Sequence, residues 1–313
     1  MIKVLAYDGG LKWGSIDDIG KNKLTFIEAC TPKSQELKKI AEKTEIPLVD
    51  IEEAIDPEER PRTLENEHYS LIIFRTPVVG KKGLSTTPIA LFFNQNLVFC
   101  IRHTNVEVFD KLYELSEENK KKIFEQGSSY LTYWLIDNMQ AAYFPQMDKI
   151  EDRINRVEAK IYKDPRESLI HEIFYLKKVL IYFHKAITAN REVITSLEKA
   201  YLKHINSKHL KSFMYIYNDT VQLLDMESTY RDILTSAMDI YLTSVSNNLN
   251  IIIRKMTALG SIVLIPTLIT GIYGMNFNRM PEISWVYGYP FALGLMIASA
   301  LLLFIYFRIK KWL

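Results

Sequence analysis

The chain has 313 residues, of which 48% are hydrophobic and 24% charged, and its formal net charge is +2. Its two cysteines, Cys30 and Cys100, lie far apart with no CxxC pair or Cys/His cluster, which argues against a disulfide framework and against a zinc site. The charge is uneven: residues 254–313 carry six basic side chains and one acidic one, so residues 1–253 carry about −3.

Residues 1–125 alternate between strand-like and helix-like stretches, which predicts a mixed α+β domain. The β-rich runs are IKVLAY, LIIFRT, PIALFF and LVFCIR, and the polar helical segments are SQELKKIAEKTE and NVEVFDKLYELSEENKKKIFE. The prolines and charges of DPEERPRTL predict a loop. Neither a phosphate-binding GxxxxGK[ST] nor a dinucleotide-binding GxGxxG motif occurs, so we expect no bound nucleotide. The six scattered histidines are expected at the surface.

Residues 126–255 predict long helices that form a stalk. No glycine occurs between Gly127 and Gly260, and no proline between Pro165 and Pro266. Because glycine and proline are the residues that end helices, their absence favours uninterrupted ones. The segment KHINSKH is the expected turn before a last helix, which begins near Lys208 and continues into the C-terminal region.

Residues 256–313 predict a transmembrane hairpin with spans at about 256–275 and 284–307. The stretches 256–278 and 283–307 contain no Asp, Glu, Lys or Arg, and each is long enough to cross a bilayer. Two buried core helices are the alternative, which their length disfavours. Neither span is a cleavable signal, since the N-terminal MIKVLAYDGG has no apolar core of that kind.

Charge placement predicts the orientation of the hairpin. Basic residues lie at both outer ends, and the connecting segment holds one basic and one acidic residue. By the positive-inside rule, both termini are expected in the cytoplasm and the connecting turn outside. The residues concerned are Arg254 and Lys255 before the hairpin, Arg308, Lys310 and Lys311 after it, and Arg279 and Glu282 in the turn.

Small and polar side chains recur along the last helix at steps of three and four residues. One interpretation is a seam where helices pack closely. The other is the lining of a pore made by several copies, because two spans in one chain are too few to enclose a polar path. We call this set the stripe: Asp239, Thr243, Ser246, Asn250, Ile253, Thr257, Gly260, Leu264, Thr267, Gly271 and Gly274.

The segment Tyr273-Gly274-Met275-Asn276-Phe277, at the end of the first span, resembles the signature of the CorA magnesium transporters. The segments TYRDILTSAMDIYLTSVSNNLN, MPE and KKWL are similar to that family as well. The resemblance is specific over residues 215–313 and consistent in element order elsewhere. It implies a homopentameric channel with an α+β cytoplasmic domain, a stalk helix that becomes the first span, and a second span around it.

The resemblance also implies roles for individual residues. Gly274, Met275 and Asn276 would form the selectivity filter, with Asn276 in a ring at the outer pore mouth. Met256 lies one residue away from the stripe, and the other implied pore-lining residues lie on it. The pore-lining set is Asp239, Asn250, Ile253, Met256, Leu264, Thr267 and Gly271.

Relatives often carry two aspartates early in the stalk helix that bind regulatory magnesium between protomers. The matching stretch here is YIYND, with Tyr215 and Asn218 at those positions. Asp219 and Asp225 lie nearby and are the candidate regulatory ligands. The alternative is that both are solvated surface charges.

Taken together, the residues and the resemblance predict a channel for Mg2+ influx in the cell membrane, driven by the electrochemical gradient and gated by cytoplasmic Mg2+. Mg2+ is then both the transported and the regulatory ion, and the partners are further copies of the chain, the bilayer and divalent cations, with no nucleic acid. One alternative is transport of Co2+, Ni2+ or Zn2+, although the intact Gly-Met-Asn favours Mg2+. A second is a membrane-anchored sensor or scaffold that does not conduct. An enzyme is not expected, because no nucleophile and base are paired in the sequence.

Overall fold

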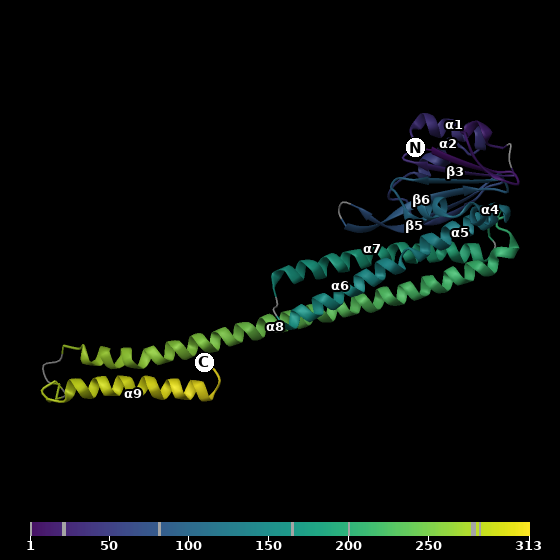
Figure 1. The fold of residues 1–313 in the computed structure, drawn as a ribbon. Helices are drawn as coiled ribbons and strands as arrows, with labels where there is room; N and C mark the ends of the chain where they lie inside the picture. Colours follow the sequence, from purple (N-terminus) through teal and green to yellow (C-terminus); the bar gives the residue numbers. More distant parts are fainter. Residues whose placement is uncertain are drawn as a thin grey trace. The chain divides into compact units, whose positions relative to one another are not determined.

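The computed structural model describes residues 2–20, 23–80, 83–163, 166–199, 201–276, 280–281 and 283–313. The chain divides into two compact units (Figure 1). The first comprises Met1–Ala159 and Glu167–Ala237, and the second comprises Lys160–Arg166 and Met238–Leu313.

The first unit is built on a seven-stranded sheet in the order β2-β1-β3-β7-β6-β5-β4. Neighbouring strands are antiparallel, except that β3 and β7 are parallel. The strands are β1 (Ile2–Tyr7), β2 (Leu11–Gly14), β3 (Leu24–Cys30), β4 (Arg62–Glu65), β5 (Ser70–Gly80), β6 (Gly83–Phe93) and β7 (Leu97–Arg102).

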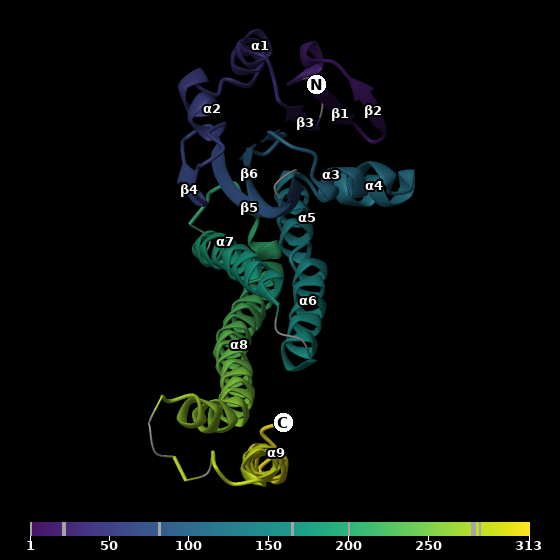
Figure 2. The ribbon, with the colours of Figure 1, turned by 90° about the vertical axis from the view of Figure 1, so that its left-hand side faces the viewer.

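Both faces of this sheet are covered, which explains why its central strands are apolar on both sides. On one face lie α1 (Ser34–Thr44) and α2 (Leu48–Ala54), and on the other lie α3 (Glu107–Glu114), α4 (Glu117–Glu125), α5 (Ser128–Ala141) and α7 (Glu167–Glu198) (Figure 2). Alternate residues of one strand therefore enter different cores: Ile72 and Phe74 face α5, and Leu71 and Ile73 face α1 and α2.

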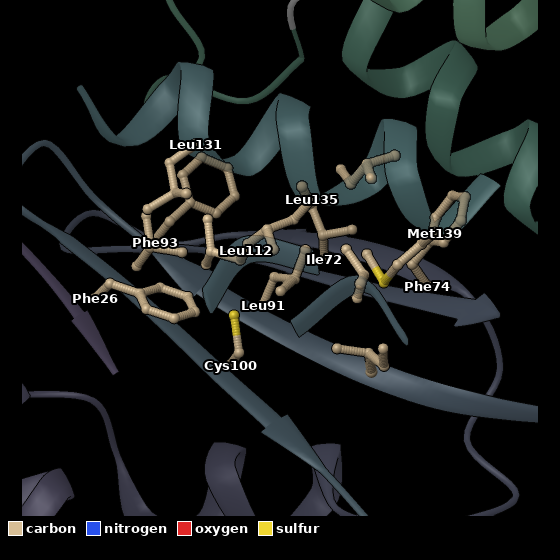
Figure 3. Close-up of a cluster of buried hydrophobic side chains, with 14 of the residues drawn as sticks. Phe26, Ile72, Phe74, Leu91, Phe93, Cys100, Leu112, Leu131, Leu135 and Met139 are labelled. Atoms are coloured by element: carbon tan, nitrogen blue, oxygen red, sulfur yellow. The ribbon is translucent and has the colours of Figure 1, made fainter. Parts of the chain in front are cut away.

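The larger core lies between the sheet and the helices that follow β7. Figure 3 shows Phe26, Phe74 and Cys100 of the sheet, with Leu135 and Met139 of α5 against it. Burial raises the pKa of the Cys100 thiol, which therefore stays protonated and apolar in character. This core fixes α5 on the sheet.

Asn190 attaches α7 to the sheet through a backbone-like pair of hydrogen bonds. Its carboxamide oxygen accepts from the Arg75 N–H at 3.0 Å, and its nitrogen donates to the Arg75 carbonyl at 2.7 Å. The Tyr143 hydroxyl donates to the same carbonyl at 3.0 Å. Because the Asn190 side chain is fully buried, both backbone groups of Arg75 are satisfied without water.

Several expectations for residues 1–125 are confirmed. IKVLAY is β1 and LVFCIR is β7, and LIIFRT and PIALFF lie inside β5 and β6. The helical segment predicted over 105–125 is two helices, α3 and α4, because the Ser116 Oγ caps the second by accepting from the Asn119 N–H at 3.3 Å.

Other expectations were wrong. DPEERPRTL is not a loop throughout, since its last residues begin the edge strand β4. β2, β3 and α2 were not predicted. His204 is not a surface residue: its side chain is 13% exposed, and its Nδ1 lies 2.9 Å from the buried Ser70 Oγ.

The helix α6 (Phe144–Lys163) follows α5, and the short 3-10 turn η2 (Ser207–His209) follows α7. Two long helices, α8 and α9, complete the chain. The expected turn at KHINSKH is present, and α8 follows it without a break over Leu210–Tyr273. α9 (Gly288–Ile309) runs back alongside the last part of α8 (Figure 1).

Candidate ion-conduction path

The second unit contains two helices that are long and apolar enough to cross a membrane, one ending at Tyr273 and the other over Gly288–Ile309. In their most apolar windows only 6% and 11% of the residues are buried, respectively. A core helix of a soluble protein would be mostly buried. Because these surfaces are apolar and uncovered, they need either lipid or further protein around them.

The stripe lies on the open face of α8. Its described members are exposed, with Gly260 and Gly271 having no atom within 4 Å of an added Cβ. Off the stripe, Ala258 is fully buried, and Ala292 of α9 is buried as well. Residues 246–260 other than Ala258 are exposed, so the stripe and the surfaces beside it are free to face other copies, lipid or water.

The structure brings the predicted pore-lining residues to this one face of α8. Ile253 is 58% exposed, and Met256 and Leu264 are each 67% exposed. Asp239, Asn250, Thr267 and Gly271 are exposed as well. Met256 departs from the stripe by one residue in sequence, but a helical period of 3.6 residues keeps it within the same face.

Hydroxyl groups on the stripe are oriented to accept hydrogen bonds. The Thr267 hydroxyl donates to the Val263 carbonyl at 2.8 Å, and the Thr243 hydroxyl donates to the Asp239 carbonyl at 2.9 Å. A hydroxyl has one proton, so only lone pairs remain to face outward. Such groups attract cations and the hydrogens of a cation's water shell.

Pro266 lies inside α8, next to Leu264 and Thr267. It has no N–H, so it cannot donate to the carbonyl four residues earlier, and its ring crowds that carbonyl. The Thr270 hydroxyl donates to the Pro266 carbonyl at 2.8 Å. The helix is therefore locally weakened within the row of candidate pore-lining residues.

The turn after α8 holds the three predicted filter residues. The N–H of Gly274 donates to Thr270 O at 2.9 Å, and that of Met275 donates to Ile272 O at 3.2 Å. A Cβ at Gly274 would lie 3.3 Å from the Thr270 carbonyl, so the glycine permits this tight closure. Met275 and Asn276 are exposed. Asn276 is the last residue before an interval, 277–279, that is outside the described residues.

Aromatic rings cluster near both ends of α9. Trp285 lies 6.2 Å from Tyr287 and 5.6 Å from Phe291, between ring centroids. At the other end Phe307 stacks on Trp312 at 5.5 Å. Aromatic side chains with polar groups prefer the two membrane–water interfaces. This distribution supports a membrane-crossing α9.

The two candidate regulatory carboxylates lie in different surroundings in the first unit. Asp225 is exposed. Asp219 is half-buried, and burial raises its pKa. Burial and the nearby charge of Asp219 raise the pKa of Asp137 on α5. Burial, and after it the charges of Asp137 and Asp219, raise the pKa of Tyr133 to about 12.

Sequence reasoning therefore missed Asp137. No periodicity connects α5 with α8, so only the tertiary fold reveals that these carboxylates interact. Tyr215, at one of the positions where relatives carry aspartate, is 70% exposed. Among the residues that the structure describes, no three His, Cys, Asp or Glu side chains gather to hold a metal ion.

Comparisons with known proteins agree with this geometry. The model of a family described as CorA-like Mg2+ transporter protein matches residues 21–311. The cobalt/magnesium transport protein CorA of Methanocaldococcus jannaschii is 32% identical over the full length of both chains. That of Thermotoga maritima is 33% identical over 85% of this chain and 76% of its own.

A solved structure is similar over the whole chain. The complete structure of the CorA magnesium transporter from Methanocaldococcus jannaschii superposes with a TM-score of 0.91 at 29% identity, covering 100% of this chain and 99% of the other. The α+β domain, the long helix and the two C-terminal apolar helices thus occur together in a known transporter.

Proposed function

The chain belongs to the family of CorA-like Mg2+ transporter proteins, and we propose that it conducts Mg2+ into the cytoplasm through a pore formed by several copies of itself. The observation that carries this proposal is the open stripe of α8, which ends at the Gly274-Met275-Asn276 turn. The proteins of this family are membrane transporters rather than enzymes.

The pore requires more than one chain. One chain supplies two spans, and its stripe is uncovered along the described residues of α8. Copies arranged around a symmetry axis would each turn the stripe inward, where it would line an aqueous path. We propose five copies, as the resemblance to the CorA transporters implies. Small residues such as Gly260 and Gly271 would allow these helices to approach closely.

Asn276 is the proposed selectivity filter. Mg2+ gives up its water reluctantly and is usually bound with several waters retained. A ring of neutral carboxamide oxygens accepts hydrogen bonds from those waters, and it does not hold the ion as a ring of carboxylates would. The filter would therefore select a hydrated cation and still release it.

Below the filter, we propose that Leu264, Met256 and Ile253 form apolar constrictions. Such constrictions close a pore by excluding water. Asn250 and Asp239 would then lie at the cytoplasmic mouth, where Asp239 draws cations. The membrane potential supplies about 2.3 kcal/mol per charge per 100 mV, or about 4.6 kcal/mol for a divalent ion, so no nucleotide is needed.

The orientation proposed for the hairpin has both termini in the cytoplasm. Arg254 and Lys255 lie at one outer end, and Arg308, Lys310 and Lys311 at the other. The same rule places the Asn276 turn outside, where it meets incoming ions first.

We further propose that cytoplasmic Mg2+ closes the pore by binding carboxylates of the stalk. Asp219 and Asp225 are the candidates, and the half-buried Asp219 interacts with Asp137. Carboxylates that face one another repel when no cation is bound. Loss of Mg2+ would then loosen the closed arrangement and shift the population toward open states.

The test is Mg2+ uptake into proteoliposomes that contain the purified chain, under an inside-negative potential. Uptake that rises with the potential and falls when the vesicles contain Mg2+ on the cytoplasmic side is expected. Protein-free vesicles and a set potential of zero are the controls. A chain that assembles in the bilayer but gives no uptake of any divalent ion would point instead to a sensor or scaffold.

Cobalt is the second candidate ion, because both relatives above are described as cobalt/magnesium transport proteins. The same vesicles, loaded with a dye that reports each metal, separate the two. Higher uptake of Co2+ than of Mg2+ at equal concentrations would make cobalt the main substrate.

A further inference from the structure

A groove between α7 and the sheet of the first unit is not used by the proposed conduction path. It consists of two adjoining hollows of about 400 and 610 Å³. They share Glu58, Arg75, Thr86 and Tyr182, so they form one continuous surface. Volumes of this size are typical of sites for small molecules.

Arg75 lies at the junction of the two hollows, and its charge is partly offset by Glu58, which lines both hollows. Its guanidinium donates to four neutral oxygens: Thr86 Oγ1 at 3.1 Å, Thr86 O at 3.0 Å, Glu59 O at 2.8 Å and Pro57 O at 3.3 Å. No ion pair between described residues includes Arg75. Burial lowers the pKa of Arg75, yet an arginine stays charged in proteins. A partly buried cation of this kind favours a bound anion.

Two further cations of α7 line the groove, one in each hollow. Lys178 and Lys185 are exposed and seven residues apart, so they share one face of the helix with about 10 Å of rise between them. Tyr182 lies between them, with the Lys178 Nζ 5.8 Å from its ring. Arg60 also lines the larger hollow. With Glu58 and Glu192 included, the lining carries a net +2, although residues 1–253 as a whole carry about −3.

The floor of the smaller hollow is fixed by a close contact. The Leu84 N–H donates to the Tyr175 hydroxyl at 3.1 Å, and the Arg153 guanidinium lies 4.6 Å from the Tyr175 ring. Gly83 has a φ of +102°, and a Cβ there would lie 2.4 Å from the Tyr175 oxygen. Only glycine fits both the conformation and the contact.

We propose that this groove binds an elongated polyanion, a polyphosphate chain either free or carried by a nucleoside triphosphate. One phosphate cannot reach Lys178, Arg75 and Lys185 together, because the two lysines alone are about 10 Å apart along the helix. A chain of phosphates can. The groove is not a phosphate-binding loop, so the missing GxxxxGK[ST] motif does not argue against it. Since polyphosphates also bind Mg2+, the metal-free and more negative form should bind more tightly.

The test measures binding of inorganic triphosphate, ATP and orthophosphate to the purified full chain by calorimetry at low ionic strength. The double variant Lys178→Gln/Lys185→Gln is compared with Lys38→Gln/Lys39→Gln, which removes the same charge from the exposed face of α1. We expect saturable triphosphate binding, at least tenfold weaker in the first variant and within twofold of the parent in the second. Excess Mg2+ should weaken it.

Comparing triphosphate with ATP distinguishes a free polyphosphate from a nucleoside triphosphate. Equal affinity for triphosphate and ATP would assign the groove to the phosphate chain alone. Tighter ATP binding that Tyr182→Leu reduces to the triphosphate value would place a nucleoside against that ring. Orthophosphate binding as tight as triphosphate, an equal loss in the Lys38/Lys39 control, or no saturable binding would each overturn the proposal. None of these results depends on transport.

Discussion

At the scale of single residues, the turn after α8 joins a constrained glycine to an uncharged polar group. Gly274 closes on the Thr270 carbonyl, and Asn276 follows two residues later with its side chain exposed. An exposed carboxamide in a nearly apolar hairpin gains nothing from packing. We therefore expect the Asn276 carboxamides of the proposed filter ring to contact the hydrated ion.

Asn276→Ala removes the only polar side chain proposed for the outer mouth. The initial rate of Mg2+ uptake into proteoliposomes should fall by about tenfold or more, which corresponds to about 1.4 kcal/mol in the barrier. Assembly should be unchanged, as measured by light scattering in detergent. A purified Asn276→Ala protein that transports at the parent rate would show that the filter lies elsewhere.

The interacting carboxylates of Asp137 and Asp219 make stability depend on pH. Their pKa values are raised in the folded chain, so the folded state holds these protons more tightly than the unfolded state. The free energy of unfolding should therefore fall as the pH rises above their ordinary value of 3.8. Below that value both states are protonated, and the penalty disappears.

Asp137→Asn removes one of the two charges and should raise the midpoint of thermal unfolding at pH 7. At about pH 3 the same variant should match the parent, because the parent carboxyl is then neutral. Asp232→Asn, on an exposed part of α8, is the control and should change neither midpoint. Equal shifts at both pH values would indicate a packing effect rather than charge repulsion.

At the scale of elements, α8 presents the candidate pore-lining residues on one exposed face, and it buries Ala258 elsewhere on its surface. Ala258 and Leu264 are separated by about 120° around the helix axis, and one is fully buried while the other is 67% exposed. An apolar residue on a face proposed to line water is unusual unless it narrows the path. Leu264 and Met256 are therefore the residues to alter in a test of closure.

Leu264→Ser or Met256→Ser should raise the Mg2+ leak when cytoplasmic Mg2+ is high, because a hydroxyl wets an apolar constriction. The leak is measured as uptake into vesicles loaded with Mg2+ on the cytoplasmic side, using a radioactive or isotopic tracer. Leu302→Ser makes the same change on an exposed part of α9 and should not raise it. If neither stripe variant differs from that control, the constriction is not at these residues.

The elements that could be read from the sequence are those with an unbroken pattern. β1 and β7 are short apolar runs, and α8 lacks both glycine and proline until Gly260. β3 was missed because Thr25 and Glu28 interrupt its apolar run. Both are buried, and Glu28 is neutralised by Arg102, whose Nε lies 2.7 Å from its carboxylate. That pairing depends on the parallel contact between β3 and β7, which no local pattern reveals.

In the candidate site, too, only features within one segment could be predicted from the sequence. The stripe could be predicted because its spacing follows the helical period within one segment. The partner of Asp219 could not, because Asp137 lies on another helix that only the fold brings near. The edge strand β4 was hidden for a different reason: it is partly exposed throughout and rich in charge, as edge strands often are.

At the scale of the whole molecule, control by cytoplasmic Mg2+ is the property that would distinguish a regulated channel from an open pore. Replacing Asp219 and Asp225 together with Asn should raise the Mg2+ concentration that inhibits uptake, without changing the preference between Mg2+ and Co2+. Asp232→Asn changes another exposed carboxylate of α8 and is the matched control. Inhibition curves that overlay for the parent and the double variant would exclude these two residues as ligands.

The aromatic rings at the two ends of α9 set a length that the surrounding lipid has to match. Its 22 residues extend about 33 Å, close to the hydrocarbon thickness of about 30 Å in a typical bilayer. Trp285 and Trp312 lie just beyond the two ends, the positions at which aromatic side chains commonly meet the membrane–water interfaces. Thinner or thicker bilayers would therefore create hydrophobic mismatch, relieved by tilting or by deforming the lipid. Mg2+ uptake should peak in vesicles of intermediate acyl-chain length, and a rate that does not vary with chain length would show that α9 does not sense thickness.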